Sequence, residues 1–311
     1  MPEAPVKSFG AITELVGNTP LVELKSFARE TPGVRIFAKC EFYNPGGSVK
    51  DRAGLQMLKD AKVPEGKTII DSTSGNTGIA LAWIGAALGL KVALVMPSNV
   101  SAARKRITKA YGAQLIFSDP LEGSDGAIRH ARKLIEAEPD RYHYLDQYSN
   151  ASNPRAHYLT TAPEIWAQTA GKVTHFVAGI GTTGTVIGTG RRLKELNPKV
   201  QIIALEPLEP MHGLEGLKHL PTSIVPHIYD EKVHDEKLSV STDAGWDMSE
   251  RLLKDEGLSL GHSSGAAAAG ALTVAKRLVA AKREGTIVTV FPDRADRYFE
   301  PKRWEKSFQW P

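Results

Sequence analysis

The sequence has a single cysteine, Cys40, among its 311 residues. One cysteine excludes an intramolecular disulfide and a zinc site built from several cysteines, and it is typical of proteins from a reducing compartment. Because Cys40 ends the apolar segment 36–40, we expect a small buried side chain there and not a reactive thiol. No metal site is predicted.

Long hydrophobic runs and a large charge of one sign are also absent. No apolar run approaches the 18 residues of a membrane-spanning helix, and residues 1–5 lack the pattern of a signal peptide. The formal net charge is only +4, with both signs interspersed, which argues against a nucleic-acid-binding surface. The densest basic run, Arg104–Arg106 with Lys109, is interpreted as a solvated helix face. We therefore expect a cytoplasmic protein that binds neither nucleic acid nor membranes.

Short β-branched segments alternate with longer helical patterns along most of the chain. Strands are expected at Val34–Glu41, Thr68–Asp71, Val92–Met96, Gln114–Phe117, Thr174–Ala178, Gln201–Leu205 and Thr286–Phe291. Helices are expected near Lys50–Ala61, Thr77–Leu88, Ser101–Tyr111, Gly126–Glu136, Ala156–Ala170, Gly184–Leu196, Asp243–Glu256 and Gly265–Arg283. The alternation predicts two α/β units with parallel sheets. Residues 206–237 lack periodicity and are expected to form a structured loop region near a ligand.

Three clusters rich in Gly, Ser or Thr fall between an expected strand and an expected helix, where an open parallel sheet presents its ligand crevice. They cover residues 44–52, 72–78 and 179–185. Neither the Walker A motif nor GxGxxG opens a βαβ unit, so nucleotide binding lacks its usual sequence support. Residues 181–185 are favoured as an anion cradle over a flexible turn, because amides at a helix start attract a phosphate.

The other two clusters are less decisive alone. Residues 72–78 would suit a substrate carboxylate, but an elaborate helix N-cap is an equal alternative. Lys50, in the first cluster, stands at a helix start, where the positive helix end and partial desolvation lower a lysine pKa, as a Schiff-base lysine requires. A lone lysine is more often a surface cation, so the choice depends on the other clusters.

Together the clusters resemble the cysteine synthase (O-acetylserine sulfhydrylase) family of fold-type II pyridoxal 5′-phosphate (PLP) enzymes. The resemblance runs in family order through NTPLV at 18–22, NPGGSVKDR at 44–52, TSGNTG at 73–78, GTTGT at 181–185 and GHSSG at 261–265. Thr183 and the segment DRADRY at 293–298 resemble the B-type branch of the family more closely. That branch tolerates larger or more anionic substrates.

The resemblance implies an α/β fold of two three-layer αβα domains with twisted, mainly parallel sheets, like the tryptophan synthase β-subunit. It implies a smaller, mobile domain over residues 42–153 that carries the substrate-carboxylate loop. A larger domain over residues 1–41 and 154–311 is expected to bind the PLP phosphate. A homodimer is implied by the resemblance alone.

The resemblance also assigns roles residue by residue. Lys50 is expected to be the Schiff-base lysine and general base, and Asn76 to hydrogen-bond the PLP 3′-oxygen. Ser263 is expected to face the pyridine nitrogen, where a neutral hydroxyl favours β-elimination over transamination; a structural serine in a helix-capping turn is the alternative. The expected phosphate loop is Gly181, Thr182, Thr183, Gly184 and Thr185. The expected substrate-carboxylate site is Thr73, Ser74, Gly75, Thr77 and Gln147.

Lys218 aligns approximately with basic residues of the B-type branch. We expect it to help bind an anionic leaving group, such as the phosphate of O-phosphoserine, or an anionic sulfur donor. A solvated surface lysine is an equal alternative, and related branches often carry arginine there, which grips phosphate in a bidentate manner. His212 is given no role. Trp304, Phe308 and Trp310 are expected to cover the core or a subunit partner.

The implied activity is PLP-dependent β-replacement, which makes L-cysteine from O-acetylserine or O-phosphoserine and sulfide or another sulfur donor. Three alternatives stay open: cystathionine β-synthase chemistry with homocysteine, serine or threonine dehydration, and a catalytically silent module that docks a partner in the same cleft. The expected partners are the amino-acid substrate and the sulfur donor. The sequence does not choose the leaving group or the donor.

Overall fold

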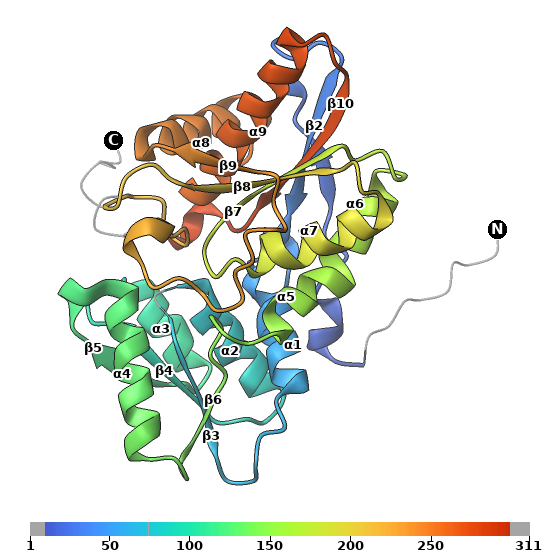
Figure 1. Ribbon diagram of the computed structural model, residues 1–311. Helices are drawn as coiled ribbons and strands as arrows, with labels where there is room; N and C mark the ends of the chain where they lie inside the picture. Colours follow the sequence, from blue (N-terminus) through green and yellow to red (C-terminus); the bar gives the residue numbers. More distant parts are fainter. Residues whose placement is uncertain (1–9, 74, 299–311) are drawn as a thin grey trace, which may run out of the picture.

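The computed structural model describes residues 10–73 and 75–298, whose strands form two sheets, one in each lobe of Figure 1. The strands are β1 Leu21–Glu23, β2 Val34–Cys40, β3 Thr68–Ser72, β4 Val92–Pro97, β5 Gln114–Ser118, β6 Tyr142–Tyr144, β7 His175–Gly179, β8 Gln201–Pro207, β9 Glu236–Val240 and β10 Gly285–Phe291. The α-helices are α1 Lys50–Asp60, α2 Asn76–Ala87, α3 Ala102–Ala110, α4 Gly123–Ala137, α5 Ser152–Ala156, α6 Ala162–Gln168, α7 Gly184–Leu196, α8 Thr242–Glu256 and α9 His262–Ala280.

The larger sheet has the strand order β1-β2-β10-β7-β8-β9. Adjacent strands in this sheet are parallel, except that β1 pairs antiparallel with β2. The chain therefore contributes β1 and β2 to this sheet, leaves it after β2 and returns at β7. The smaller sheet, with the order β5-β4-β3-β6, is parallel throughout and is built from the intervening segment. The α/β fold expected from the sequence is confirmed, whereas the domain boundaries at 41/42 and 153/154 stay a prediction.

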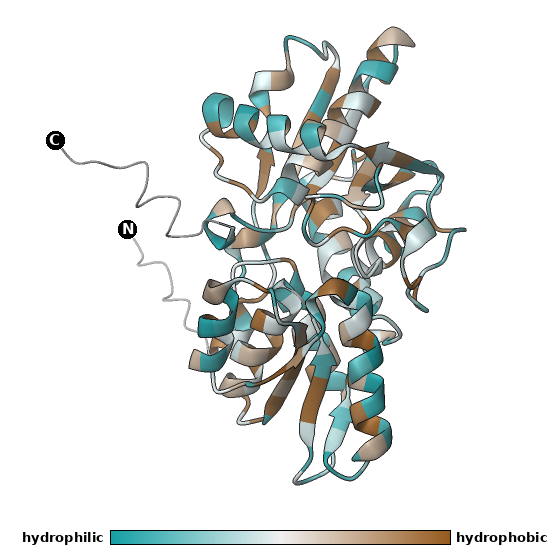
Figure 2. Ribbon diagram, turned by 90° about the vertical axis from the view of Figure 1, so that its left-hand side faces the viewer, coloured by the Kyte–Doolittle hydropathy of each residue, from teal (hydrophilic) through white to brown (hydrophobic). Residues whose placement is uncertain are grey.

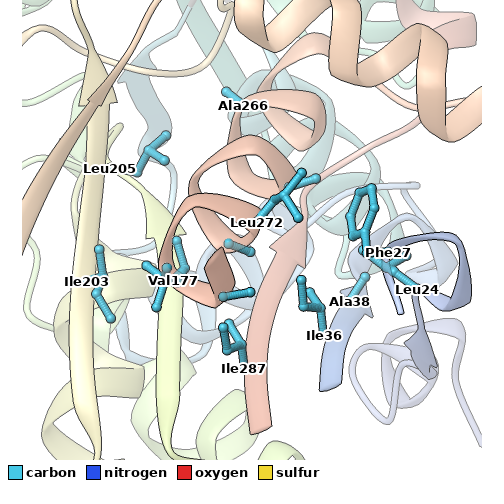
Figure 3. Close-up of a cluster of buried hydrophobic side chains, with 14 of the residues drawn as sticks. Leu24, Phe27, Ile36, Ala38, Val177, Ile203, Leu205, Ala266, Leu272 and Ile287 are labelled. Carbon is cyan, nitrogen blue, oxygen red and sulfur yellow. The ribbon is translucent and has the colours of Figure 1, made fainter. Parts of the chain in front are cut away.

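Helices cover both faces of both sheets, because successive strand residues point to opposite sides. On the larger sheet, Val177 packs with the α8–α9 layer, while its neighbours Phe176 and Ala178 pack with α6 and α7. Figure 3 shows the first of these cores, with Ile36, Val177, Ile203 and Ile287 on the strands facing helix α9. On the smaller sheet, α1 and α2 pack on one face and α4 on the other. Figure 2 shows the hydrophobic residues gathered along the strands and the hydrophilic ones on the outer helix faces.

Two details differ from the sequence-based expectations. The short strands β1, β6 and β9 were not predicted, because three to five residues with partly exposed side chains give little periodic signal. The single helix expected over 156–170 is instead α5, a π-helical turn at His157–Thr161 and α6. The widened turn lies just before Pro163, which has no amide hydrogen to donate to the preceding turn.

The prediction for Cys40 is confirmed: its side chain is fully buried, and burial raises the thiol pKa to about 12. Within residues 10–73 and 75–298, no helix combines the length and hydrophobicity that crossing a membrane requires.

Candidate active site

A cleft of about 860 Å³ opens where loops at the carboxyl ends of the parallel strands meet. It is lined by segments that follow each of the strands β2 to β8, and by Tyr298 after β10. Strand polarity places the loop that follows each parallel strand at the same edge of its sheet, so residues distant in sequence converge there. A smaller inner pocket adjoins the cleft and shares Lys50, Asn76 and Gly181 with it.

Most of the predicted site residues line this cavity. The cleft wall includes Lys50, Thr73, Gly75, Asn76, Thr77, Gln147, Gly181, Thr182 and Lys218. The inner pocket adds Thr183, Thr185 and Ser263. Gly184 lines neither, because it is the first residue of α7 and packs against the side chain of Asn153. Ser74 and the aromatic residues Trp304, Phe308 and Trp310 lie outside the described residues.

Lys50 is the first residue of α1 and is partly exposed to the cleft. Desolvation lowers the pKa of its amine to about 8, and the negative charge of Asp293 acts in the opposite direction. A lysine with this pKa has a sizeable neutral fraction near physiological pH, which an amine nucleophile or a general base needs.

Residues 181–185, at the junction of β7 and α7, have the features of the expected anion cradle. Thr183, the N-cap residue of α7, has a left-handed backbone with φ of 75°, and its Oγ1 is buried with no hydrogen-bond partner in the described part of the chain. Gly181 approaches the Gly216 carbonyl so closely that a methyl group there would overlap its oxygen. A helix N-terminus, an orphan hydroxyl and a tight glycine together suit a phosphate. With Lys50 in the same inner pocket, these residues fit PLP.

Two residues that the sequence analysis did not single out support the cradle. Asn153 donates from Nδ2 to Thr182 Oγ1 at 3.0 Å and to the Gln147 carbonyl at 2.8 Å. His157 places its ring nitrogens 2.9 Å from Thr161 Oγ1 and 3.3 Å from Thr185 Oγ1. Burial lowers the His157 pKa to about 3, so the ring is neutral and adds no charge to the cradle. Nothing in their local sequence marks them, since both contacts join segments separated by 28 or 29 positions.

The loop after β3 is held in place by hydrogen bonds to its own backbone and to the loop after β6. Thr73 Oγ1 accepts from the amides of Gly75 and Gly78, at 3.2 and 3.1 Å. Thr77 Oγ1 donates to Gln147 Oε1 at 2.8 Å, and Gln147 Nε2 donates to the Ser72 carbonyl at 2.6 Å. This arrangement places hydroxyl and amide groups along the cleft wall, as a bound carboxylate would require.

Asn76 belongs to a hydrogen-bond network with residues 293–298, which follow β10, and the sequence analysis did not foresee it. Its Nδ2 donates to Asp293 Oδ2 at 2.6 Å, and its Oδ1 accepts from Arg297 at 2.6 Å. Arg297 also donates to the Gly46 carbonyl, and the Tyr298 hydroxyl donates to Asp293 at 2.5 Å. Burial raises the pKa of Asp293. The available signal was position, because residues 293–298 follow a strand as the other site loops do.

Ser263 is the second residue of α9, is 5% exposed and lines the inner pocket. The N-cap of this helix is Gly261, and no side chain caps it. The helix-capping alternative considered for Ser263 is therefore wrong, and its predicted role toward a pyridine nitrogen stays a prediction.

Two ion pairs lie in the outer cleft, by which we mean the part of the cleft lined by α3, by the start of α4 and by residues 215–218. Arg104 on α3 pairs with Glu215 at 2.6 Å, and Lys218 pairs with Asp125 on α4 at 2.7 Å. Arg104 is 9% exposed, so the solvated-face interpretation is wrong for it, although Arg106 and Lys109 are exposed. Helical periodicity indicated the basic face of α3, but it could not indicate that the loop containing Glu215 covers Arg104. Lys218 is 7% exposed, which excludes the solvated-surface alternative.

A buried network of ion pairs is centred on Arg52, two residues after Lys50. The Arg52 guanidinium binds Glu41 at 2.7 Å and Glu164 at 2.7 Å, and Lys39 binds Glu164 at 2.7 Å. Thr19 donates to Glu41 at 2.7 Å. Two cations face two carboxylates, so the network is neutral, and it ties the first turn of α1 to β2 and α6.

Comparisons with known proteins identify the family of the chain. The family model described as "Pyridoxal-phosphate dependent enzyme" matches residues 12–293. The chain is 51% identical to a cysteine synthase of Aquifex aeolicus, covering 94% of this chain and 91% of that protein. It is 44% identical to cysteine synthase B of Pseudomonas aeruginosa, covering 93% and 96%. A crystal structure of cysteine synthase from Entamoeba histolytica superposes with a TM-score of 0.89 at 36% identity, covering 100% of this chain and 95% of that one.

Proposed function

The chain belongs to the pyridoxal-phosphate-dependent enzyme family, and we propose that it is a cysteine synthase that makes L-cysteine and acetate from O-acetylserine and sulfide. One observation carries the proposal: the low-pKa amine of Lys50 shares an inner pocket with Gly181, Thr182, Thr183 and Thr185 of the anion cradle. That pairing suits a cofactor with an aldehyde at one end and a phosphate at the other. The relatives named cysteine synthase supply the reaction.

In this proposal the cradle residues hold the phosphate, and Lys50 Nζ is the covalent attachment point of the aldehyde. When bound, PLP supplies an electron-accepting ring that stabilises negative charge at the substrate Cα. Lys50 Nζ would act as the general base that takes the substrate Cα proton and later returns it. Its pKa of about 8 suits both directions of transfer.

The remaining residues orient the substrate and the cofactor. Thr73, Gly75 and Thr77, with Gln147, bind the substrate carboxylate through hydroxyl and amide donors in this proposal, and Ser74 belongs to the same set. Asn76 holds the 3′-oxygen side of the ring, while Asp293 and Arg297 fix the orientation of its amide. Ser263 faces the ring nitrogen as a neutral partner.

The decisive experiment measures cysteine formation by the purified PLP-loaded protein from O-acetylserine and sulfide, with homocysteine and with serine alone as parallel arms. Lys50→Ala is expected to lower kcat/KM by roughly 10²–10⁴-fold, the usual contribution of a general base. Lys59→Ala, an exposed lysine on the same helix, is the matched control. Faster product formation with homocysteine would replace the proposal by cystathionine β-synthase chemistry. Retention of activity by Lys50→Ala would refute the assignment of Lys50.

We also propose that the protein works as a cytoplasmic homodimer. The single buried cysteine supports a reducing compartment. The side chains of Ile12, Leu15, Tyr43 and Tyr111 are 40–65% exposed and line one groove, as expected where a second copy packs. Sedimentation of the PLP-loaded protein at several concentrations tests the dimer.

A further inference from the structure

Each of the two cations of the outer cleft is neutralised by a carboxylate that lies across the cleft from it. Arg104 and Lys218, which both line the cleft, form ion pairs with Glu215 and Asp125, which line it too. Glu122, the N-cap residue of α4, is a third carboxylate that lines the cleft, and it pairs with Arg129 at 2.9 Å. The outer cleft therefore presents little net positive charge to a substrate, despite its two basic side chains.

The pair between Lys218 and Asp125 is held more firmly than a surface ion pair. The two side chains are 8% and 21% exposed, and Lys218 Nζ lies 2.7 Å from Asp125 Oδ1. Lys218 Nζ also lies 5.2 Å from the centroid of the Tyr148 ring, which lines the same cleft. Asp125 Oδ2 accepts from the amide of Ile224 at 2.8 Å. Both carboxylate oxygens of Asp125 are thus bound by the loop that they face, and these two contacts oppose a displacement of Asp125 by an anion.

The charge of the leaving group decides how a substrate responds to this arrangement. The acetyl ester of O-acetylserine is uncharged, so it meets no electrostatic penalty beside a neutral ion pair. The phosphate of O-phosphoserine carries a charge of about −1.5 to −2 at neutral pH. It must compete with a fixed carboxylate for Lys218 and bring like charges together, which is unfavourable in a partly desolvated site.

We propose that Asp125 is a specificity-determining residue that selects against substrates with a phosphate leaving group by neutralising Lys218. This inference rests on the proposed function, because its two substrates are those of a cysteine synthase. The sequence predicts that Lys218 binds an anionic leaving group. In this proposal Lys218 binds a phosphate only when Asp125 loses its charge.

The test compares the PLP-loaded parent with Asp125→Asn and with the double variant Asp125→Asn/Lys218→Met. Two quantities are measured: the ratio of kcat/KM for O-phosphoserine to that for O-acetylserine, and the affinity for inorganic phosphate by calorimetry. Asp125→Asn is expected to raise both by about tenfold or more, since one like-charge contact is removed. Loss of Lys218 in the double variant is expected to cancel both gains.

Glu122→Gln is the matched control, because it removes one carboxylate beside the same cleft and breaks its pair with Arg129, but leaves the Lys218 pair intact. An equal gain in this control, or no gain in phosphate affinity for Asp125→Asn, overturns the proposal. Asp125→Ser, also uncharged, is the second variant if Asp125→Asn does not fold. A parent that makes no cysteine refutes the proposed function, while the phosphate titration still decides the role of Asp125.

Discussion

Incorporation of PLP into the cofactor-free protein is expected to depend on pH through the amine of Lys50. Only the neutral amine attacks an aldehyde, and burial lowers the Lys50 pKa from 10.5 to about 8. At pH 7 about 9% of such amines are neutral, against about 0.03% for an ordinary lysine. The neutral fraction of Lys50 is therefore about 300 times larger at pH 7, and this advantage disappears above pH 10.5.

The assay mixes cofactor-free protein with excess PLP between pH 6 and 10 and follows the visible absorbance of the lysine adduct. The same series with Nα-acetyl-lysine corrects for the titration of PLP itself. The protein rate, divided by the rate for the free amine, is expected to be constant below pH 8 and to fall at higher pH. Lys50→Ala is expected to give no adduct, which assigns the signal to this residue.

Asp293→Asn sharpens the test, because the charge of Asp293 is the one interaction that raises the Lys50 pKa. The variant is expected to move the midpoint below 8, and the asparagine can still accept the hydrogen bond from Asn76. A protein rate that rises in parallel with the free amine up to pH 10 would show that Lys50 is not desolvated. The stated basis for its reactivity would then be wrong.

Two further predictions concern the elements that hold the site. Glu41→Gln is expected to destabilise the protein by about 3–5 kcal/mol in urea unfolding, because it leaves the two buried cations Arg52 and Lys39 with a single carboxylate, Glu164. Glu23→Gln, which breaks the solvent-accessible pair with Arg35, should cost at most about 1 kcal/mol, and equal costs for the two variants would contradict the argument. Gly181→Ala is expected to weaken PLP binding about tenfold or more in a spectral titration, because its methyl group would overlap a fixed backbone carbonyl; an unchanged dissociation constant would show that the loop is not a tight cradle.

Local sequence was informative wherever a strand, a turn and a helix follow one another. Lys50, Asn76 and residues 181–185 could be singled out because each lies at such a junction, and parallel sheets gather these junctions at one edge. Element bounds were less predictable where tertiary contacts outweigh local propensity, as at β9 and at the helix interrupted before Pro163.

Partners across the cleft were not predictable. Asp293 meets Asn76 over 217 positions of sequence, and Glu215 meets Arg104 over 111. Helical spacing identified a basic face on α3 but not the loop that neutralises Arg104. For Lys218, neither of the weighed alternatives included a carboxylate on α4.

The sequence by itself determined the α/β class and the family, and it predicted the roles of Lys50 and of the loop 181–185, because each follows from the order of local patterns or from motifs in register. Only the tertiary structure decided which charges meet. Ion pairs between α3, α4 and the loop after β8 depend on how two separately formed sheets are placed, and no local pattern encodes that distance. The cleft's electrostatic character is therefore a property of the folded chain.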